Sequence, residues 1–301
     1  MNDIHVRVAA AALSLLALSG CGGGGGTEGT IGDIVVGPGN NGLPGAVEGL
    51  TLSGDATGIE FDAASARSSA AGQQLVTIPV TFGADFFRYS VLDGPGALDA
   101  DIVVNGQPVT ITNGVGSYGG SEAVLTYDPD TMGEYSAIFG VTVPEQGIQQ
   151  AYAVGFETDP SVLATISRAV LYEGGFSAQG TSRRSGDVQE AELDGSVAFL
   201  VDFDGADRIS ADLEGTWTHG AGGTSLTLYL KLDPRALDGN EFSGALLCAD
   251  RSCSGSSSRI SGTFYGPMAN ELAGVMAIDA TVSGYTFEGA GNFLITDPVA
   301  Q

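Results

Sequence analysis

The stretch Gly-Thr-Phe-Tyr-Gly-Pro-Met-Ala-Asn-Glu-Leu-Ala-Gly, residues 262–274, decides the fold of this chain. Successive side chains of a β-strand point to opposite faces, so Phe264 is expected to face the interior of a barrel and Tyr265 to face outward. Gly266 and Pro267 follow directly, and this pair favours a turn that ends the strand. The stretch therefore predicts a strand that enters a turn at one end of a β-barrel.

The rest of the same stretch is expected to lead the chain back into the barrel. Residues 269–272 are predicted to form one helical turn over the barrel end, before a new strand starts near Gly274. Glu271 is expected either to cap that turn or to make a contact that closes the barrel. All these roles are structural, so the stretch indicates a fold and not a ligand site.

The segments around this stretch have the even spacing of barrel strands. Leucines at every second position from Leu226 to Leu232 alternate with Thr227, Tyr229 and Lys231, which predicts one buried face. Glycines within strands allow the sharp bends that a small closed barrel requires. An outer-membrane barrel is the alternative, but the polar face carries charges and paired aromatic girdles are missing. The expected strands are 151–158, 169–178, 196–203, 208–218, 225–232, 241–248, 259–265, 271–282 and 285–295, with interior glycines Gly174, Gly215, Gly244, Gly262, Gly274 and Gly289.

Residues 46–148 contain shorter β-rich runs that glycines separate. Asn105-Gly106 follows Val103 and Val104 and is the strongest short signal for a β-hairpin. No helical periodicity exceeds about three turns, so we expect an all-β protein in which residues 46–148 form a β-sandwich or handle-like domain. The expected strands are 74–81, 86–91, 101–104, 108–112, 123–127 and 135–143.

The composition excludes two classes of partner. The 301 residues include 36 acidic and 11 basic side chains, giving a formal net charge of −25, and Lys231 is the single lysine. This charge excludes attraction to nucleic acid and to an anionic lipid surface. The 47 glycines and 11 prolines, together with 43% hydrophobic residues, indicate a turn-rich globular protein.

The N-terminal residues have the pattern of an exported lipoprotein. Residues 1–20 contain an apolar run of about eleven residues, which is too short to span a bilayer and is typical of a signal peptide. The tetrad Leu-Ser-Gly-Cys that ends at Cys21 resembles a bacterial lipobox, whose cysteine receives the lipid. The alternative is an ordinary secretory signal followed by a stray cysteine.

Lipidation of Cys21 would tether the mature chain to a membrane without spanning it. Gly22 follows the cysteine, and the absence of an aspartate at this position favours the outer membrane. Residues 21–45 are rich in glycine and predict a flexible linker that holds the folded part away from the membrane.

Two further cysteines agree with export. Cys248 and Cys253 are separated by four residues, and in an oxidising compartment they are expected to form a disulfide across a small loop. A metal pair is the alternative, but His219 is the only histidine after the signal peptide, and a zinc site needs about four ligands. We therefore expect no metal site at these cysteines.

The 262–274 stretch also carries a family resemblance. It resembles the G-x-F-Y-G-P-x-A-x-E-L-x-G signature of the transferrin-binding protein B-like β-barrel domain. The resemblance implies an eight-stranded antiparallel β-barrel over residues 149–301, preceded by a handle domain over residues 46–148. Three further segments support it: 197–203, which resembles a barrel strand ending in Asp-Phe, 239–244, which is similar to a G-x-x-F-S-G hairpin, and Tyr172-Glu173-Gly174, which matches a Y-x-G motif.

The same resemblance implies a function by binding alone. Proteins of this type are lipid-anchored surface receptors, so the chain is expected to capture a host or environmental protein or an iron-containing ligand. It would pass that ligand to an outer-membrane transporter. Only one lobe is present, which puts transferrin itself in doubt as the ligand. The alternative function is a surface adhesin or an immune-evasion lipoprotein that binds a host factor.

The sequence contains few candidates for catalysis or cofactor binding. A Ser-His-Asp hydrolase would need His219 as its base, but this residue lies in a Gly-rich turn that supports catalysis poorly. Phosphate-binding loops, zinc motifs and dinucleotide-binding motifs are absent. Haem would need an axial ligand such as His219 or a tyrosine, which is a weak signal. We expect no enzyme and no cofactor.

The remaining candidates are acidic loops that could bind calcium and one aromatic residue that could bind a partner. Calcium could bind the aspartates of two loops, but neither has the spacing of a known calcium motif, and solvated turns are the simpler interpretation. Trp217, with His219 beside it, is the candidate for a partner-binding surface, because interface anchors are enriched in tryptophan. The alternative is that Trp217 closes the mouth of the barrel. The loop aspartates are Asp128, Asp130, Asp202, Asp204 and Asp207.

Overall fold

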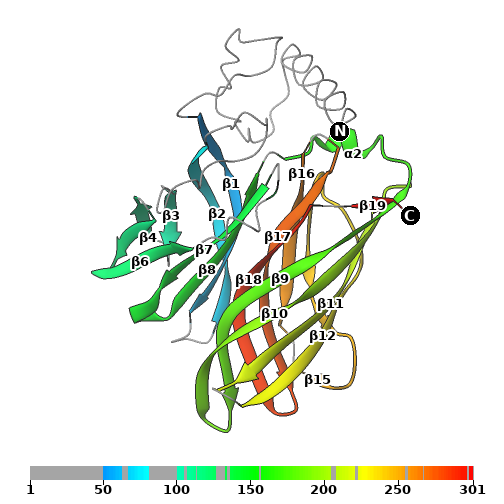
Figure 1. The fold of residues 1–301 in the computed structure, drawn as a ribbon. Coiled ribbons are helices and arrows are strands. Elements are labelled where there is room, and N and C mark those ends of the chain that lie inside the picture. Colours follow the sequence, from blue (N-terminus) through cyan, green and yellow to red (C-terminus); the bar gives the residue numbers. More distant parts are fainter. Residues whose placement is uncertain are drawn as a thin grey trace, which may run out of the picture.

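A computed structural model gives the arrangement of the chain, which is almost entirely β (Figure 1). Two short helical segments are present among the described residues, η2 (Pro144–Gln146) and α2 (Pro160–Leu163). The structure describes residues 50–62, 67–80, 100–104, 107–112, 114–126, 133, 136–155, 157–204, 208–220, 223–254, 257–266, 268–296 and 298–300. The signal peptide, Cys21, the linker 21–45, the expected strand 86–91 and Asp128, Asp130 and Asp207 lie outside this set.

The first half of the chain builds an antiparallel sheet of six strands. A separate hairpin joins two more strands, in which Val104 lies opposite Gln107. This pairing confirms the hairpin expected around residues 105–106, which themselves lie outside the described residues. The strands of the first sheet, in spatial order, are β2 (Arg67–Val80), β1 (Leu50–Asp62), β8 (Ile148–Gly155), β7 (Ser136–Val143), β6 (Ser121–Thr126) and β5 (Val115–Tyr118), and the hairpin is β3 (Ala100–Val104) with β4 (Gln107–Ile111).

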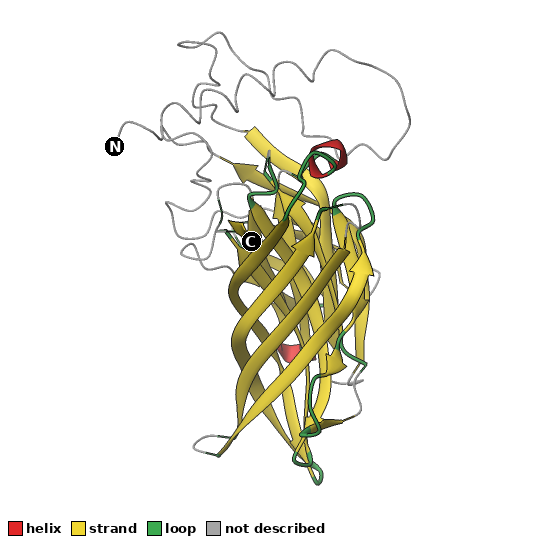
Figure 2. Ribbon diagram, turned by 90° about the vertical axis from the view of Figure 1, so that its right-hand side faces the viewer, coloured by secondary structure: helices red, strands yellow, loops and turns green. Residues whose placement is uncertain are grey.

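The second half forms a nearly closed antiparallel barrel, whose strands coil around its axis (Figure 2). Short strands are added at two places, where β15 pairs with β17 and β19 pairs with β9. The strands in spatial order are β13 (Glu241–Ala245), β16 (Arg259–Tyr265), β17 (Glu271–Val282), β18 (Tyr285–Ile295), β9 (Ala169–Arg184), β10 (Asp187–Asp202), β11 (Arg208–His219), β12 (Thr224–Ala236) and β14 (Leu247–Cys248), with β15 (Cys253–Ser254) and β19 (Val299–Ala300) beside them.

One bent segment joins the two edges of this sheet. Its first part, β13, pairs with β16, and its last part, β14, pairs with β12. Between these pairings Leu246 N donates to Ser258 O at 2.8 Å, and just beyond β14 Ala249 N donates to Tyr229 O at 2.9 Å. Counted as one strand, β13 and β14 complete an eight-stranded barrel, so the expected all-β fold with an eight-stranded barrel is confirmed.

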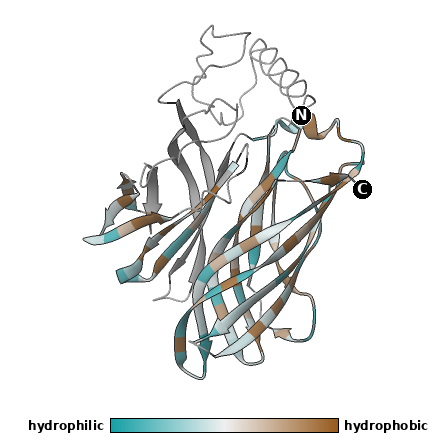
Figure 3. Cartoon of the chain, viewed as in Figure 1, coloured by the Kyte–Doolittle hydropathy of each residue, from teal (hydrophilic) through white to brown (hydrophobic). Residues whose placement is uncertain are grey.

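The barrel interior is a packed apolar core. Leu226, Leu228, Leu230 and Leu232 are 2–6% exposed, as their alternation predicts, while Tyr229 between them is 38% exposed. Figure 3 shows hydrophobic and hydrophilic residues alternating along the barrel strands. The largest side chains of this core with relative exposure below 2% are Trp217, Tyr172, Phe199, Phe264, Phe287, Phe293 and Leu193.

Pairs of glycines face one another across adjacent barrel strands. In one pair, Gly195 of β10 lies opposite Gly215 of β11. The Phe176 ring lies over both, with Cζ only 2.8 Å from the position that a Cβ of Gly215 would occupy. The backbone can therefore approach closely here because neither residue has a side chain. The other facing pairs are Gly180 with Gly289 and Gly262 with Gly274.

The two aromatic residues of the fold-deciding stretch lie as predicted. Phe264 is 0% exposed inside the barrel, with ring centroids 5.6 Å from Tyr172 and 5.7 Å from Phe203. Tyr265 faces outward but is only 2% exposed, because it packs in a small cluster between the barrel wall and the first sheet. Burial raises the pKa of the Tyr265 hydroxyl above its usual value.

The helical turn predicted for residues 269–272 is wrong. Ala269 has a φ of 53°, a left-handed conformation that a right-handed helix cannot contain. The Asn270 side chain instead accepts a hydrogen bond from Met268 N at 3.1 Å, and strand β17 begins at Glu271. A tight turn therefore replaces the helix, because the asparagine oxygen takes up a backbone donor locally.

Glu271 connects the barrel to the first sheet. Its carboxylate accepts a hydrogen bond from Ser136 Oγ at 2.5 Å, and both residues are buried. A side chain at Gly133 would collide with this carboxylate. Glu271 is thus not a helix cap, and its contact with Ser136 joins the barrel to the first sheet.

The predicted barrel strand at 151–158 is also wrong. Residues 151–155 belong to β8, which pairs with β1 and β7 in the first sheet. Alternation and length predict a strand but do not specify its neighbours, which explains the error.

The expected boundary between residues 148 and 149 falls inside β8, and the domain division remains a prediction. We now propose it within residues 156–168, where Asp159 Oδ1 accepts from Ser161 N at 2.8 Å and caps α2.

Candidate functional site

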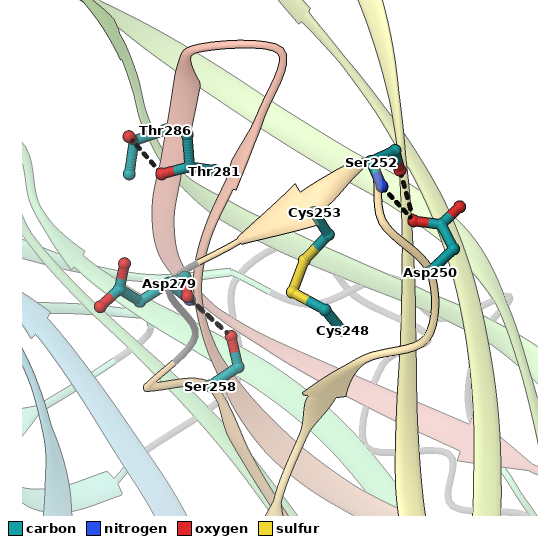
Figure 4. Close-up of a disulfide and its surroundings, with 8 residues drawn as sticks. All are labelled: Cys248, Asp250, Ser252, Cys253, Ser258, Asp279, Thr281 and Thr286. Atoms are coloured by element: carbon teal, nitrogen blue, oxygen red, sulfur yellow. Dashed lines mark hydrogen bonds between the residues drawn. A yellow bond between two sulfur atoms is a disulfide. The ribbon is translucent and has the colours of Figure 1, made fainter.

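The predicted disulfide is present beside the segment that completes the barrel. Cys248 and Cys253 are bonded, with their Cα atoms 5.5 Å apart (Figure 4). Within the loop, Asp250 Oδ1 accepts hydrogen bonds from Ser252 N at 2.8 Å and from Ser252 Oγ at 2.5 Å. These hydrogen bonds lower the pKa of the Asp250 carboxyl. The bridge and the carboxylate order a short loop, which is a structural role.

Trp217 is not an exposed anchor, so that expectation is wrong. Its side chain is 1% exposed in the barrel core, where its ring centroid lies 5.8 Å from that of Phe287. Its Nε1 donates to Ser182 Oγ at 3.0 Å. The alternative interpretation, that Trp217 fills the barrel near its end, agrees with this position. Alternation along β11 places Trp217 on the buried face, and this signal was already present in the sequence.

His219 lies next to Trp217 in a polar cluster at the same end of the barrel. Its Nδ1 is 3.0 Å from Ser182 Oγ, and its Nε2 is 3.2 Å from Asp187 Oδ2. The Tyr285 ring packs edge-on against the imidazole at a centroid distance of 5.1 Å. The pKa of Asp187 is lowered, first by a hydrogen bond from Gln189 and then by His219. These contacts tie together β9, β10, β11 and β18.

Serine, histidine and aspartate are the residue types of a hydrolase triad, but this cluster does not have the access that catalysis needs. Ser182 is 0% exposed, and its Oγ already accepts a hydrogen bond from Trp217 Nε1. A nucleophile must reach a substrate atom, and here the core surrounds the hydroxyl. The geometry supports a structural role, in which these contacts hold the barrel strands together, and not a catalytic site.

The described residues contain no group of three or more His, Cys, Asp or Glu side chains that could hold a metal ion. Two of the loop aspartates can be placed. Asp202 Oδ1 accepts from Asp204 N at 3.0 Å, which is a turn interaction. Among all the residues that the structure describes, no helix has both the length and the apolar character needed to cross a membrane.

A cleft of about 670 Å³ lies between the first sheet and the barrel. Its volume is within the range of small-ligand sites. Asn292 Nδ2 donates to Phe139 O at 3.2 Å and links the two walls. Figure 1 shows β7 and β8 beside β9 and β18, the strands that supply most of the lining. The lining includes Thr126, Ile138, Phe139, Gly140, Thr142, Gln149, Gln150, Gly175, Phe176, Ser177, Gln179, Glu192, Asp194, Ala290, Gly291, Asn292, Leu294 and Thr296.

Two features distinguish this cleft chemically. Gln149 Oε1 is buried and has no hydrogen-bond partner among the described residues. Glu192 and Asp194 are exposed at the cleft, and neither forms an ion pair within the described part of the chain. A second hollow of about 730 Å³ on the outer wall of β10 and β11 shares both carboxylates with the cleft.

Sequence reasoning missed this cleft because its lining comes from strands of both sheets. One signal was available: Glu190, Glu192 and Asp194 recur at every second position and therefore share one face of a strand. That pattern predicts an acidic outer face, but it does not predict what lies opposite.

The barrel also matches a known family. Residues 166–290 match the model described as the C-lobe and N-lobe beta barrels of Tf-binding protein B. The barrel is of the transferrin-binding protein B type. The match covers less than half of the chain and leaves the six-stranded sheet outside it. No curated protein matches the chain.

Solved structures of this type are similar at low identity. Transferrin binding protein B isotype 1 from serogroup B Neisseria meningitidis is 17% identical over 82% of this chain and 44% of that chain, with a TM-score of 0.38. The N-lobe domain of lactoferrin binding protein B of Moraxella bovis is 11% identical over 80% and 98%, with a TM-score of 0.38. HpuA from Kingella denitrificans, solved in complex with human haemoglobin, is 11% identical over 84% and 90%, with a TM-score of 0.30. The chain spans about half the length of several transferrin-binding protein B chains that it matches, including the Neisseria meningitidis protein.

Proposed function

We propose that the chain is a non-catalytic surface receptor that captures a host protein. The observation that carries this proposal is the match of residues 166–290 to the barrels of Tf-binding protein B. The packed interior supports it, because Trp217, Phe199 and Phe264 are each at most 1% exposed and leave the barrel no cavity for a small ligand at these positions. A partner would therefore bind the outer surfaces.

The proposed receptor serves iron uptake. The captured protein would carry iron or haem, and an outer-membrane transporter would receive the cargo. The acidic surface is compatible with a protein partner and opposes binding to anionic lipid, since the net charge is −25.

A capture experiment tests this function. The purified full chain is immobilised and offered human transferrin, lactoferrin and haemoglobin in equal amounts, with serum albumin as the control protein. We expect one of the three to be retained with a dissociation constant of about 1 μM or tighter, as is usual for specific complexes, and albumin to pass through. Passage of all four proteins would contradict the proposal.

We further propose that Cys21 anchors the chain to the outer membrane through a lipid. Cys21→Ser is expected to leave the chain as an unprocessed precursor or in soluble form, because the serine cannot receive the thioether-linked lipid that holds the chain in a membrane. Detergent phase partitioning and intact-mass analysis measure this change. The double variant Cys248→Ser/Cys253→Ser is the control and should partition like the wild type. Equal partitioning of Cys21→Ser and wild type would show that the anchor lies elsewhere.

A further inference from the structure

We propose that the cleft between the first sheet and the barrel binds an extended peptide segment that carries a lysine or arginine side chain. The inference rests on the proposed function, because the segment would belong to the captured protein. It names the binding site and the chemistry of the segment, which the family match does not do.

The floor of the cleft is formed by residues with small side chains or none, and it is as long as a short strand. Gly175, Ser177, Ala290 and Gly291 supply small side chains or none along β9 and β18. From Gly175 to Gln179 the strand runs about 13 Å at roughly 3.3 Å per residue, which accommodates about four extended residues. A polypeptide backbone can lie on such a floor without displacing large side chains.

One wall presents neutral polar groups to that backbone. Thr126, Thr142 and Gln149 come from β6, β7 and β8. Gln149 Oε1 has no donor among the described residues, although buried acceptors are normally hydrogen-bonded. The Thr126 side chain is exposed on the same wall, so its hydroxyl is an acceptor that a peptide N–H can reach. A sugar ring is less suitable, because Phe139 and Phe176 are buried at 2% and 6% exposure and offer no exposed stacking face.

The opposite rim presents negative charge. Glu192 and Asp194 are exposed on β10 and have no cationic partner within the described residues, while Ser177 Oγ is 3.5 Å from Glu192 Oε1. The second hollow continues from these carboxylates along the outside of β10 and β11. A long basic side chain can therefore leave the cleft and follow this wall while its charge lies beside two carboxylates.

Peptide titrations test the charge requirement. The probe is a fluorescein-labelled peptide, Ala-Lys-Ala-Lys-Ala-Lys-Ala, titrated with the full chain and followed by fluorescence anisotropy. We expect Glu192→Gln/Asp194→Asn to weaken binding about tenfold, because both rim charges are lost. The matched control Asp212→Asn/Glu214→Gln removes the same charge from exposed positions on β11 outside the cleft, and it should change affinity less than about twofold.

A steric pair of variants tests the position of the peptide. Ser177→Tyr places a ring over the cleft floor and is expected to abolish binding, while Ser210→Tyr adds the same ring to β11 away from the cleft and should not. Circular dichroism melts of both variants confirm that they are folded.

Three outcomes would overturn the inference: equal weakening by both charge pairs, equal binding of a peptide with glutamate in place of lysine, or full binding by Ser177→Tyr. These outcomes are separate from the fate of the proposed function. Host-protein capture that survives Ser177→Tyr and Glu192→Gln/Asp194→Asn would refute the cleft as the site and leave the receptor intact. Lysine-peptide binding in the cleft without capture of any host protein would support the cleft and refute the receptor.

Discussion

Gly195→Ala is expected to be among the most destabilising single substitutions in the barrel. A Cβ at this position would overlap the Glu214 carbonyl oxygen and lie 2.6 Å from Gly215 Cα and 2.8 Å from Phe176 Cε1. Backbone atoms of a paired strand cannot move without breaking their ladder, so the collision forces β10 and β11 apart. We expect a loss of at least about 3 kcal/mol in the free energy of unfolding, at the upper end of overpacking effects.

A matched glycine gives the control for this prediction. At Gly175 an added Cβ would meet only Gly195 O at 3.6 Å, which is ordinary contact. Gly175→Ala should therefore remain within about 1 kcal/mol of wild type. In thermal melts the Gly195 variant should lose about 6–12 °C in Tm, given roughly 2–4 °C per kcal/mol for a domain of this size. Equal Tm values for the two variants would mean that the close approach of β10 and β11 does not depend on the facing glycines Gly195 and Gly215.

Phe264→Ala should have an effect of similar size through a different mechanism. The ring is 0% exposed and packs against Tyr172 and Phe203, so its removal leaves a cavity that the barrel wall cannot fill. Loss of a buried phenylalanine costs about 3–5 kcal/mol. Urea unfolding of the full chain measures this cost.

Leu200→Ala is the control for the phenylalanine. Leu200 is 46% exposed on the outer face of β10, so its truncation removes little buried surface and should change stability by about 0.5 kcal/mol or less. If Phe264→Ala were as mild, the 262–274 stretch would not organise the core in the way that we describe.

Local sequence patterns predicted the parts of the fold that depend on local chemistry. The leucines from Leu226 to Leu232 face the core because a strand alternates its side chains. Phe264 and Tyr265 take opposite faces for the same reason. The Cys248–Cys253 bridge follows from two cysteines close in sequence. Each of these features is decided within a few residues.

Features that depend on distant residues could not be predicted in this way. The pairing of β8 with β1 joins two strands that have most of the first half of the chain between them. The contact between Glu271 and Ser136 joins strands far apart in the chain. The cleft with Gln149, Glu192 and Asp194 exists only because two sheets meet. The left-handed Ala269 is a local error of a different kind, because alanine normally favours a helix.

The pairing of β9 with β18 determines when the barrel closes during synthesis and its strand edges are no longer exposed. β9 is the first long strand of the barrel and β18 the last, and Phe176 lies opposite Phe293 across them. The other long strands pair with neighbours in the sequence and can form as hairpins, whereas this pairing must close a long loop. Until β18 has been translated, β9 and β17 both expose an open edge. A chain interrupted before Tyr285 would therefore present two unpaired strand edges to other chains, which is the condition for edge-to-edge aggregation.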